Sequence, residues 1–167
     1  MAYDGDFDWQ RGLIPQIKQI LADYLIGEAN DEEDRLRNTD LIVLRLRTIR
    51  VACRLRRHQY LAHYGDQFTI RADRPSGVQT ELQKVISGWG EYIFYGFASP
   101  DGGSLTSYVL GDLNVFRLWH SQQLAMKRTP WIAKGNHDGS STFHAYRIND
   151  LPGSFVVART IPRAVAA

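Results

Sequence analysis

The sequence predicts a mixed α/β (α+β) fold, in which a central β-sheet with an N-terminal β-meander is flanked by helices. Segments with apolar residues at helical spacing lie on both sides of short segments in which apolar and polar residues alternate. Three strand-like stretches come between an opening helix and a second helix, an order typical of helices packed against a mixed sheet. The length of 167 residues fits one domain, so we expect residues 1–167 to form a single domain with an irregular tail at about 152–167.

The first predicted element is an amphipathic helix over residues 9–25. Apolar side chains recur there at helical spacing, Pro15 is expected in the first turn, and Gly27 follows the end. Residues 28–38 are almost all polar or charged and indicate a solvated connection. The first 34 residues contain nine acidic side chains and only two basic ones, so this part of the chain is strongly negative.

Three strands are predicted next, at residues 41–46, 49–55 and 67–71. The first two are joined tightly, and both alternate apolar with cationic residues, which gives a hairpin with one apolar face and one cationic face. Residues 41–65 contain six arginines and no acidic residue. With the third strand included, the predicted cationic face consists of Arg45, Arg47, Arg50, Arg54, Arg56 and Arg71.

The rest of the chain alternates between helices and strands. Thr80 is a suitable N-cap for a helix that runs to about Gly88, and residues 92–97 form an apolar run typical of a strand covered on both faces. Three more elements follow: a strand at 108–110, a helix at 113–126 capped by Asp112, and a strand at 142–148. The tryptophans expected to fill the core are Trp89, Trp119 and Trp131.

The cationic face is the most specific functional feature of the sequence. Like charges on neighbouring strands repel one another, so this face needs an anion or an acidic segment against it. A guanidinium group can donate two parallel hydrogen bonds to a phosphate, which suits arginine to nucleic acid. The sequence therefore predicts nucleic-acid binding, with DNA as the expected polymer. The alternative is that Glu32, Glu33 and Asp34 fold back and neutralise the arginines.

Three residues near the cationic face are candidates for phosphodiester chemistry. Glu81 and Lys84 lie one helical turn apart, where the carboxylate could support a metal ion and the lysine could stabilise charge that develops on a phosphate. Asp40 opens the first strand and can hold Mg²⁺ through its oxygens. The alternatives are an ordinary ion pair on a helix surface for Glu81 and Lys84, and a turn residue for Asp40.

The element order and these residues resemble the PD-(D/E)XK phosphodiesterase superfamily over residues 9 to 110. The core of that family is a helix, a three-stranded meander, a helix and a further strand. The resemblance implies a Mg²⁺-dependent nuclease, or a degenerate relative of one, in which Asp40 and Glu81 hold the metal ion and Lys84 stabilises the scissile phosphate. The sequence has Arg54-Leu55-Arg56 where the family carries its acid and lysine, so the pair would have moved to the following helix.

The stretch from Phe68 to Phe97 is similar to bacteriophage and prophage proteins. That context gives a second hypothesis, a non-enzymatic protein that binds a host defence or replication protein, with a homodimer as one form. Its sign would be an acidic segment, residues 28–34, lying over the arginines, together with an apolar patch exposed elsewhere.

The remaining features of the sequence limit its function and location. Gly135-Asn136-His137-Asp138 is similar to a metallophosphoesterase motif, but the other ligands of that family are missing, so we expect a polar turn. No apolar run reaches the length of a membrane span, and the acidic N-terminus differs from a secretory signal. The single cysteine, Cys53, cannot form an internal disulfide, which favours the cytoplasm, or the host cytoplasm for a phage protein.

Overall fold

The computed structural model describes four stretches of the chain, residues 2–28, 41–43, 49–136 and 139–160. The chain divides into two compact units, residues 1–48 and 49–167. The expectation of a single domain stays a prediction.

The first unit contains a helix and a two-stranded sheet. α1 spans Ala2–Leu25, so it begins earlier than predicted, and Pro15 lies inside it rather than in its first turn. β1 (Ile26–Glu28) pairs antiparallel with β2 (Leu41–Val43). The start of the predicted strand at 41–46 is therefore a strand, but its partner is the segment directly after α1.

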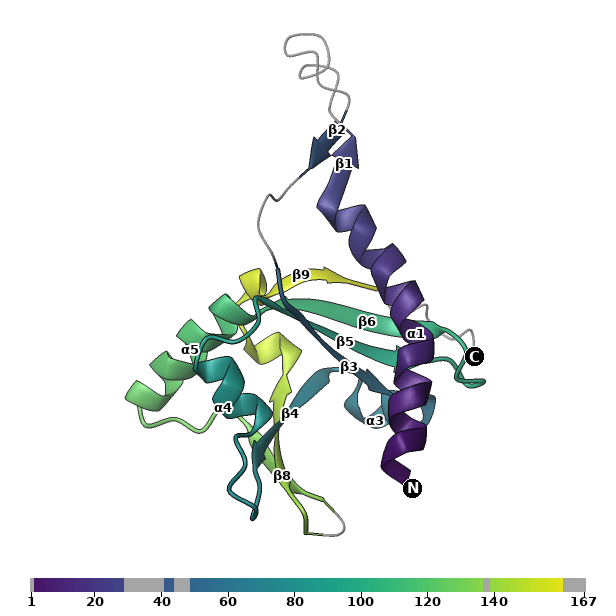
Figure 1. Cartoon of the computed structure of the whole chain (residues 1–167). Helices are drawn as coiled ribbons and strands as arrows, with labels where there is room; N and C mark the ends of the chain where they lie inside the picture. The colour runs from purple at the N-terminus through teal and green to yellow at the C-terminus, as the bar shows by residue number, and fades with distance from the viewer. Residues whose placement is uncertain (1, 29–40, 44–48, 137–138, 161–167) are drawn as a thin grey trace, which may run out of the picture. The chain divides into compact units, whose positions relative to one another are not determined.

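The second unit contains two further sheets (Figure 1). The four-stranded sheet has the order β3-β5-β6-β9, in which β3 runs parallel to β5 and the other neighbours are antiparallel. Its strands are β3 (Val51–Arg56), β5 (Tyr92–Ala98), β6 (Leu105–Asp112) and β9 (Val156–Arg159). The three-stranded sheet is antiparallel with the order β4-β8-β7. Its strands are β4 (Gln67–Asp73), β8 (Thr142–Arg147) and β7 (Ile132–Gly135).

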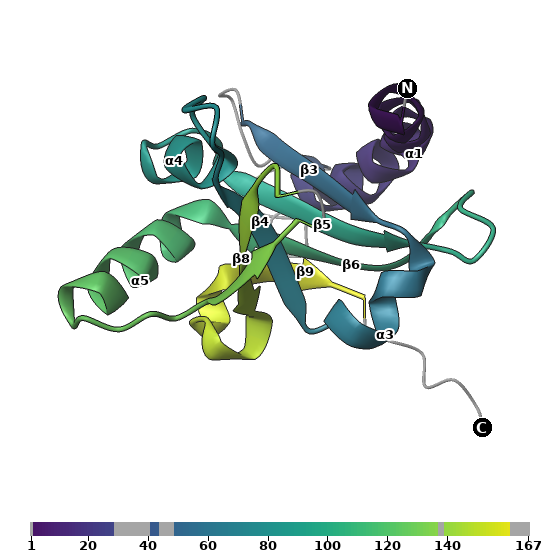
Figure 2. The same cartoon turned by 90° about the horizontal axis from the view of Figure 1, so that it is seen from below.

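The mixed α+β class is confirmed, whereas the predicted N-terminal meander is wrong. Among the described residues, β2, β3 and β4 belong to three different sheets, and the partner of β3 is β5. Between β3 and β4 the chain forms η1 (His58–Tyr60) and α3 (Leu61–Tyr64), which lead it from one sheet into the other. In Figure 2, β4 and β8 run across the direction of β5 and β6 as a separate layer.

Two helices accompany these sheets, α4 (Glu81–Ile86) and α5 (Leu113–Ala125). Both start at the predicted caps. The Thr80 hydroxyl accepts a hydrogen bond from the Gln83 backbone N–H, and the Gln83 side chain accepts one from the Thr80 N–H in return. The Asp112 carboxylate accepts hydrogen bonds from the N–H groups of Asn114 and Val115. None of the described helices is long and apolar enough to cross a membrane.

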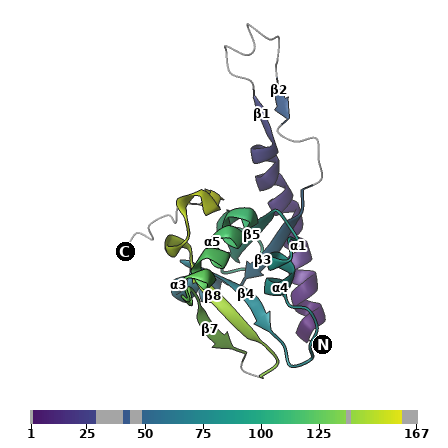
Figure 3. The ribbon, with the colours of Figure 1, turned by 90° about the vertical axis from the view of Figure 1, so that its left-hand side faces the viewer.

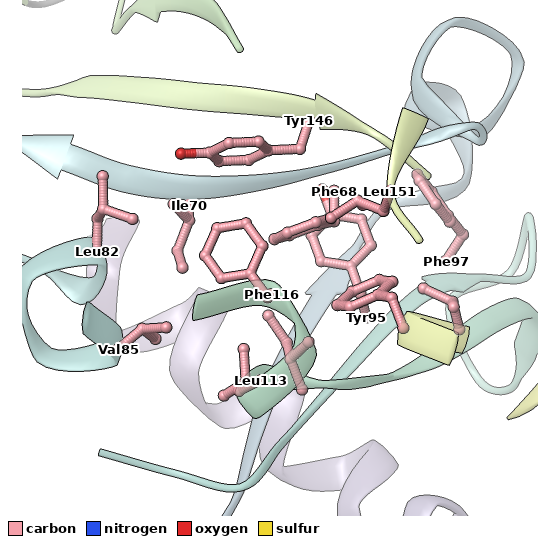
Figure 4. Close-up of a cluster of buried hydrophobic side chains, with 13 residues drawn as sticks. Phe68, Ile70, Leu82, Val85, Tyr95, Phe97, Leu113, Phe116, Tyr146 and Leu151 are labelled. Atoms are coloured by element: carbon pink, nitrogen blue, oxygen red, sulfur yellow. The ribbon is translucent and has the colours of Figure 1, made fainter. Parts of the chain in front are cut away.

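The hydrophobic core joins both sheets to α4 and α5 (Figure 4). Phe68 on β4 is fully buried at its centre, with its ring stacked on those of Tyr146 and Phe155 at centroid distances of 5.3 Å and 5.5 Å. Trp119 and Trp131 pack against this core, as expected, but Trp89 is 65% exposed.

Phe155 belongs to the segment that the sequence predicted as an irregular tail, and up to residue 160 that prediction is wrong. The segment forms η3 (Gly153–Phe155) and then β9, which pairs with β6, after a short helix η2 (Ile148–Asp150). Phe155 is fully buried, so this part of the chain completes the core.

Candidate nucleic-acid interface

One face of the three-stranded sheet carries a cation, an aromatic ring and a second cation in one row. Phe143 on β8 lies opposite Arg71 on β4 and also opposite Lys134 on β7. Figure 3 shows β7, β8 and β4 side by side. Residues directly opposite one another in a sheet project to the same face, so Phe143 stands between two positive side chains. The guanidinium carbon of Arg71 is 5.3 Å from the centre of the Phe143 ring.

Two arginines of β3 approach the same ring from the other sheet. Arg54 and Arg56 are two residues apart and share one face of β3, and Arg54 lies opposite Tyr95 of β5. The guanidinium carbon of Arg54 is 5.1 Å from the centre of the Phe143 ring. Tyr95 belongs to the buried core, so the arginine face of β3 is an inner face of the unit. The expectation of an open arginine surface is wrong at these positions.

The reason lies in how β3 is covered. Leu55, on the opposite face of the strand, is also buried, with 5% of its surface exposed. Alternation in the sequence indicates which residues share a face, but it does not tell which positions the rest of the fold covers: Cys53, on the same face as Leu55, is exposed.

Glu81, the first residue of α4, neutralises part of the charge around Phe143. Its Oε2 accepts a hydrogen bond from the Arg54 guanidinium and another, of 3.0 Å, from the backbone N–H of Arg71. The Arg54 side chain is 17% exposed. Burial lowers the pKa of the Arg54 guanidinium, and the Glu81 carboxylate opposes this effect. An arginine nevertheless stays charged at neutral pH, so Glu81 acts here as an ion-pair partner.

Arg56 is held by two neutral side chains. Its Nε donates to the Tyr95 hydroxyl over 3.0 Å, and its Nη2 donates to the Thr69 hydroxyl. The two hydroxyl oxygens are 3.2 Å apart. These bonds fix the orientation of the guanidinium group but leave its charge and its other N–H groups available. A partly buried cation with uncharged partners favours an anion beside it.

A cavity of about 240 Å³ lies beside Arg56, between the two sheets and the turn that connects β3 to β4. Its wall includes four aromatic rings and two cations, from Tyr60, Tyr64, Tyr95, Phe143, Arg56 and Lys134. The Lys134 Nζ lies 4.0 Å from the centre of the Tyr64 ring. We call this cavity, together with Arg54, Arg71 and Glu81 next to it, the cationic pocket.

The structure thus brings Arg54, Arg56, Arg71 and Glu81 together, and it places two other predicted residues elsewhere. Arg50 is outside the wall of the cavity: its side chain is 64% exposed, and its Nη1 lies 3.9 Å from Oε1 of Glu91. Lys84 is exposed on α4. Three further predicted residues, Asp40, Arg45 and Arg47, lie outside the described residues, so their roles stay predictions.

The Mg²⁺ ion expected at Asp40 and Glu81 stays a prediction, because Asp40 lies outside the described residues. In the part of the chain that the structure describes, there is no group of three or more His, Cys, Asp or Glu side chains able to hold a metal. Glu81 lies against the Arg54 guanidinium, whose positive charge disfavours a second cation at the same carboxylate. Mg²⁺ prefers a site built from several oxygens.

Sequence reasoning missed Lys134 and Phe143. Lys134 lies on β7, which was not predicted, directly before the stretch from Gly135 to Asp138 that was interpreted as a polar turn. Phe143 did carry a signal, because alternation along the predicted strand at 142–148 places it on the opposite face from Tyr146, the buried residue. Asn136, from the rejected metallophosphoesterase motif, also lines the cavity.

Comparisons with known proteins do not identify a family. No protein-family model matches the chain, no curated protein matches it, and no solved structure matches its fold. The PD-(D/E)XK and phage resemblances therefore stay predictions, and the function is inferred from the cationic pocket.

Proposed function

We propose that this protein binds nucleic acid, with phosphate groups meeting the cationic pocket. The observation that supports this most is the convergence of Arg54 and Arg56, from one sheet, with Arg71, from the other. Lys134 joins them across the row of the three-stranded sheet. The Glu81 carboxylate pairs with Arg54, whereas the hydrogen-bond partners of Arg56 are the hydroxyl groups of Tyr95 and Thr69. Like charges held this close repel one another, and a bound anion relieves the repulsion.

Unsatisfied hydrogen-bond donors support a phosphate in particular. Within the described residues, the Nε of Arg71 is buried and has no hydrogen-bond partner. Arg56 has N–H groups beyond those bound to Thr69 and Tyr95. A buried donor without a partner costs about 1–3 kcal/mol, so an acceptor there is favourable. Phosphate oxygens accept from guanidinium groups in pairs, and this geometry is stronger than a neutral hydrogen bond.

Hydrolysis of the nucleic acid is a hypothesis separate from binding. Cleavage by Asp40, Glu81 and Lys84 with Mg²⁺ is what the PD-(D/E)XK resemblance implies. Incubation of the protein with linear and branched DNA, with and without Mg²⁺, tests it. Absence of cleavage would refute the enzyme hypothesis and leave the binding proposal standing.

We also propose that the protein works in the cytoplasm, with DNA as its polymer. Cys53 is a free and exposed thiol in the structure. An exposed thiol persists in a reducing compartment, where disulfides are rare. This supports an intracellular site of action, such as the host cytoplasm for a phage protein.

A second candidate function is protein binding through exposed apolar side chains. Trp89 and Leu118 are 65% and 63% exposed, and Ile86 is 41% exposed, on or directly after two helices, α4 and α5, that contact each other. Large exposed apolar groups are typical of contacts with a partner, such as a host protein or a second copy of this chain. The other sign of this hypothesis, acidic residues 28–34 over the arginines, falls on residues outside the described part. Sedimentation of the wild type and of Trp89→Ser tests self-association.

Salt dependence of DNA affinity tests the proposed function. Each phosphate contact releases a counterion, so affinity should fall linearly with the logarithm of salt concentration, with a slope of about −0.7 to −0.9 per contact. We expect a slope that corresponds to several contacts. Negligible binding, or binding insensitive to salt, would overturn the proposal and favour the protein-binding candidate.

A further inference from the structure

The cationic pocket is lined by aromatic rings as well as by cations, and the rings differ in how available they are. Tyr64 is covered on one side by Lys134 and lies 6.3 Å from the Tyr60 ring, centre to centre. Tyr95 is 1% exposed. Tyr60 is 41% exposed, and Phe143 is partly exposed between its guanidinium neighbours. Tyr60 is therefore the ring that a ligand can reach, because guanidinium groups lie over the Phe143 ring.

The size of the cavity restricts what can lie against these rings. A cube of 240 Å³ has an edge of about 6 Å, which admits a flat ring system but not a double helix, whose major groove alone is roughly 12 Å wide. In a duplex the bases are stacked and paired inside, so they are not free to leave for such a cavity. In a single strand the bases can turn outward and stack on aromatic side chains.

We propose, on the basis of the proposed function, that the cationic pocket receives an unpaired base of a single-stranded nucleic acid. The base stacks on Tyr60, and the adjacent phosphates bind Arg56 and Lys134. The same cations that attract any polyanion then select a single strand over a duplex, because only a single strand gains the stacking contact. The group recognised is a nucleobase linked to a phosphate, and a single-stranded nucleic acid supplies it.

Fluorescence anisotropy at one salt concentration can test this. The probes are a labelled oligothymidylate, the same strand annealed to oligoadenylate, and unlabelled thymidine monophosphate as competitor. Tyr60→Leu is the test variant, and Val157→Ala is the control, an exposed apolar side chain on β9 outside the wall of the cavity. Thermal unfolding checks that each variant is folded.

We expect the single strand to bind at least about tenfold more tightly than the duplex. Tyr60→Leu should weaken single-strand binding by about fivefold or more, which corresponds to the loss of one stacked base, and should leave duplex binding unchanged. Val157→Ala should change neither affinity.

Three results would overturn the inference. If duplex and single strand bind alike and Tyr60→Leu affects both equally, phosphate binding stands but the pocket does not bind a base. If the mononucleotide binds as tightly as the strand, the ligand is a free nucleotide. If neither strand nor duplex binds, the proposed function itself fails.

Discussion

Arg71 on β4 and Phe143 on β8 are cross-strand neighbours, and the guanidinium carbon of Arg71 lies 5.3 Å from the centre of the Phe143 ring. Arg54 lies at a similar distance, 5.1 Å, from the same ring. A ring between two guanidinium groups stabilises both of them through its negative face. The row of Arg71, Phe143 and Lys134 is therefore part of the fold as well as of the proposed interface.

The first prediction concerns this ring. Phe143→Leu should lower the free energy of unfolding by about 1–2 kcal/mol, since it removes two cation–ring contacts and some packing. Phe143→Tyr keeps the ring and should retain most of the stability. Urea unfolding of the three proteins measures the difference. Equal losses of unfolding free energy in Phe143→Leu and Phe143→Tyr would show that the cation–ring contacts do not contribute to stability.

The second prediction distinguishes two roles for Glu81, an ion-pair partner of Arg54 and a metal ligand. Glu81→Gln leaves the mostly buried Arg54 guanidinium without its carboxylate and should cost about 1–2 kcal/mol of stability. It also makes the pocket more positive, so affinity for DNA should rise. Denaturation and anisotropy measure both effects. A fall in DNA affinity, or the loss of a Mg²⁺-dependent cleavage present in the wild type, would instead identify Glu81 as a metal ligand.

Short-range features of this chain were predictable from sequence. The caps Thr80 and Asp112 were found because a capping side chain bonds backbone N–H groups within three residues of itself. The strand at 92–97 was found because a continuous apolar run reports burial on both faces. These signals are complete within a few residues, so no knowledge of the rest of the fold is needed.

Pairing and pocket formation were not predictable in the same way. The partner of β3 is β5, about forty residues further along the chain, and nothing in Val51–Arg56 specifies that choice. Lys134 was missed because β7 has four residues and no alternating pattern. Arg54 and Arg56 were correctly placed on one face, but the sheet that covers this face is built from distant residues, so its burial was not foreseen.

The third prediction tests the packing between β6 and the C-terminal segment. A Cβ on Gly111 would lie 2.3 Å from Cζ of the Phe155 ring, so Gly111→Ala must displace a fully buried side chain. We expect a loss of about 1–3 kcal/mol, seen as a lower melting temperature. Gly103→Ala is the control, because its Cβ would meet nothing closer than 3.7 Å. Equal melting temperatures for the two variants would contradict the close packing.

The fourth prediction follows from a stack of rings, His120, Trp131 and His144. The Trp131 ring lies 5.4 Å from His120 and 4.3 Å from His144, centre to centre. Burial lowers the pKa of both histidines, and it lowers that of His144 to about 4, helped by the charge of His120. Between about pH 6.5 and pH 4 the unfolded chain thus binds more protons than the folded one, so stability should fall as the pH falls through this range.

Denaturant unfolding at several pH values, followed by tryptophan fluorescence, measures this dependence. His144→Gln removes one titrating group and should flatten the profile between pH 6.5 and pH 4. The stability of His144→Gln at pH 7 gives the effect of the substitution apart from any titration of His144. A variant profile as steep as that of the wild type would show that His144 does not titrate in this way.

The central claim is that nucleic acid binds at the cationic pocket, and paired substitutions test it most directly. Arg56→Gln with Lys134→Gln removes two cations from the wall of the cavity, while Arg128→Gln with Arg159→Gln removes two exposed cations that are not part of that wall. The two double variants have the same net charge. The measurement is the affinity for labelled oligothymidylate over a series of salt concentrations.

We predict that the pocket double variant loses about tenfold or more in affinity and shows a shallower salt dependence, because each phosphate contact is worth about one unit of slope. The control pair should stay close to the wild type. Equal losses in the two double variants would mean that net charge alone attracts the polymer, and that result would contradict the claim.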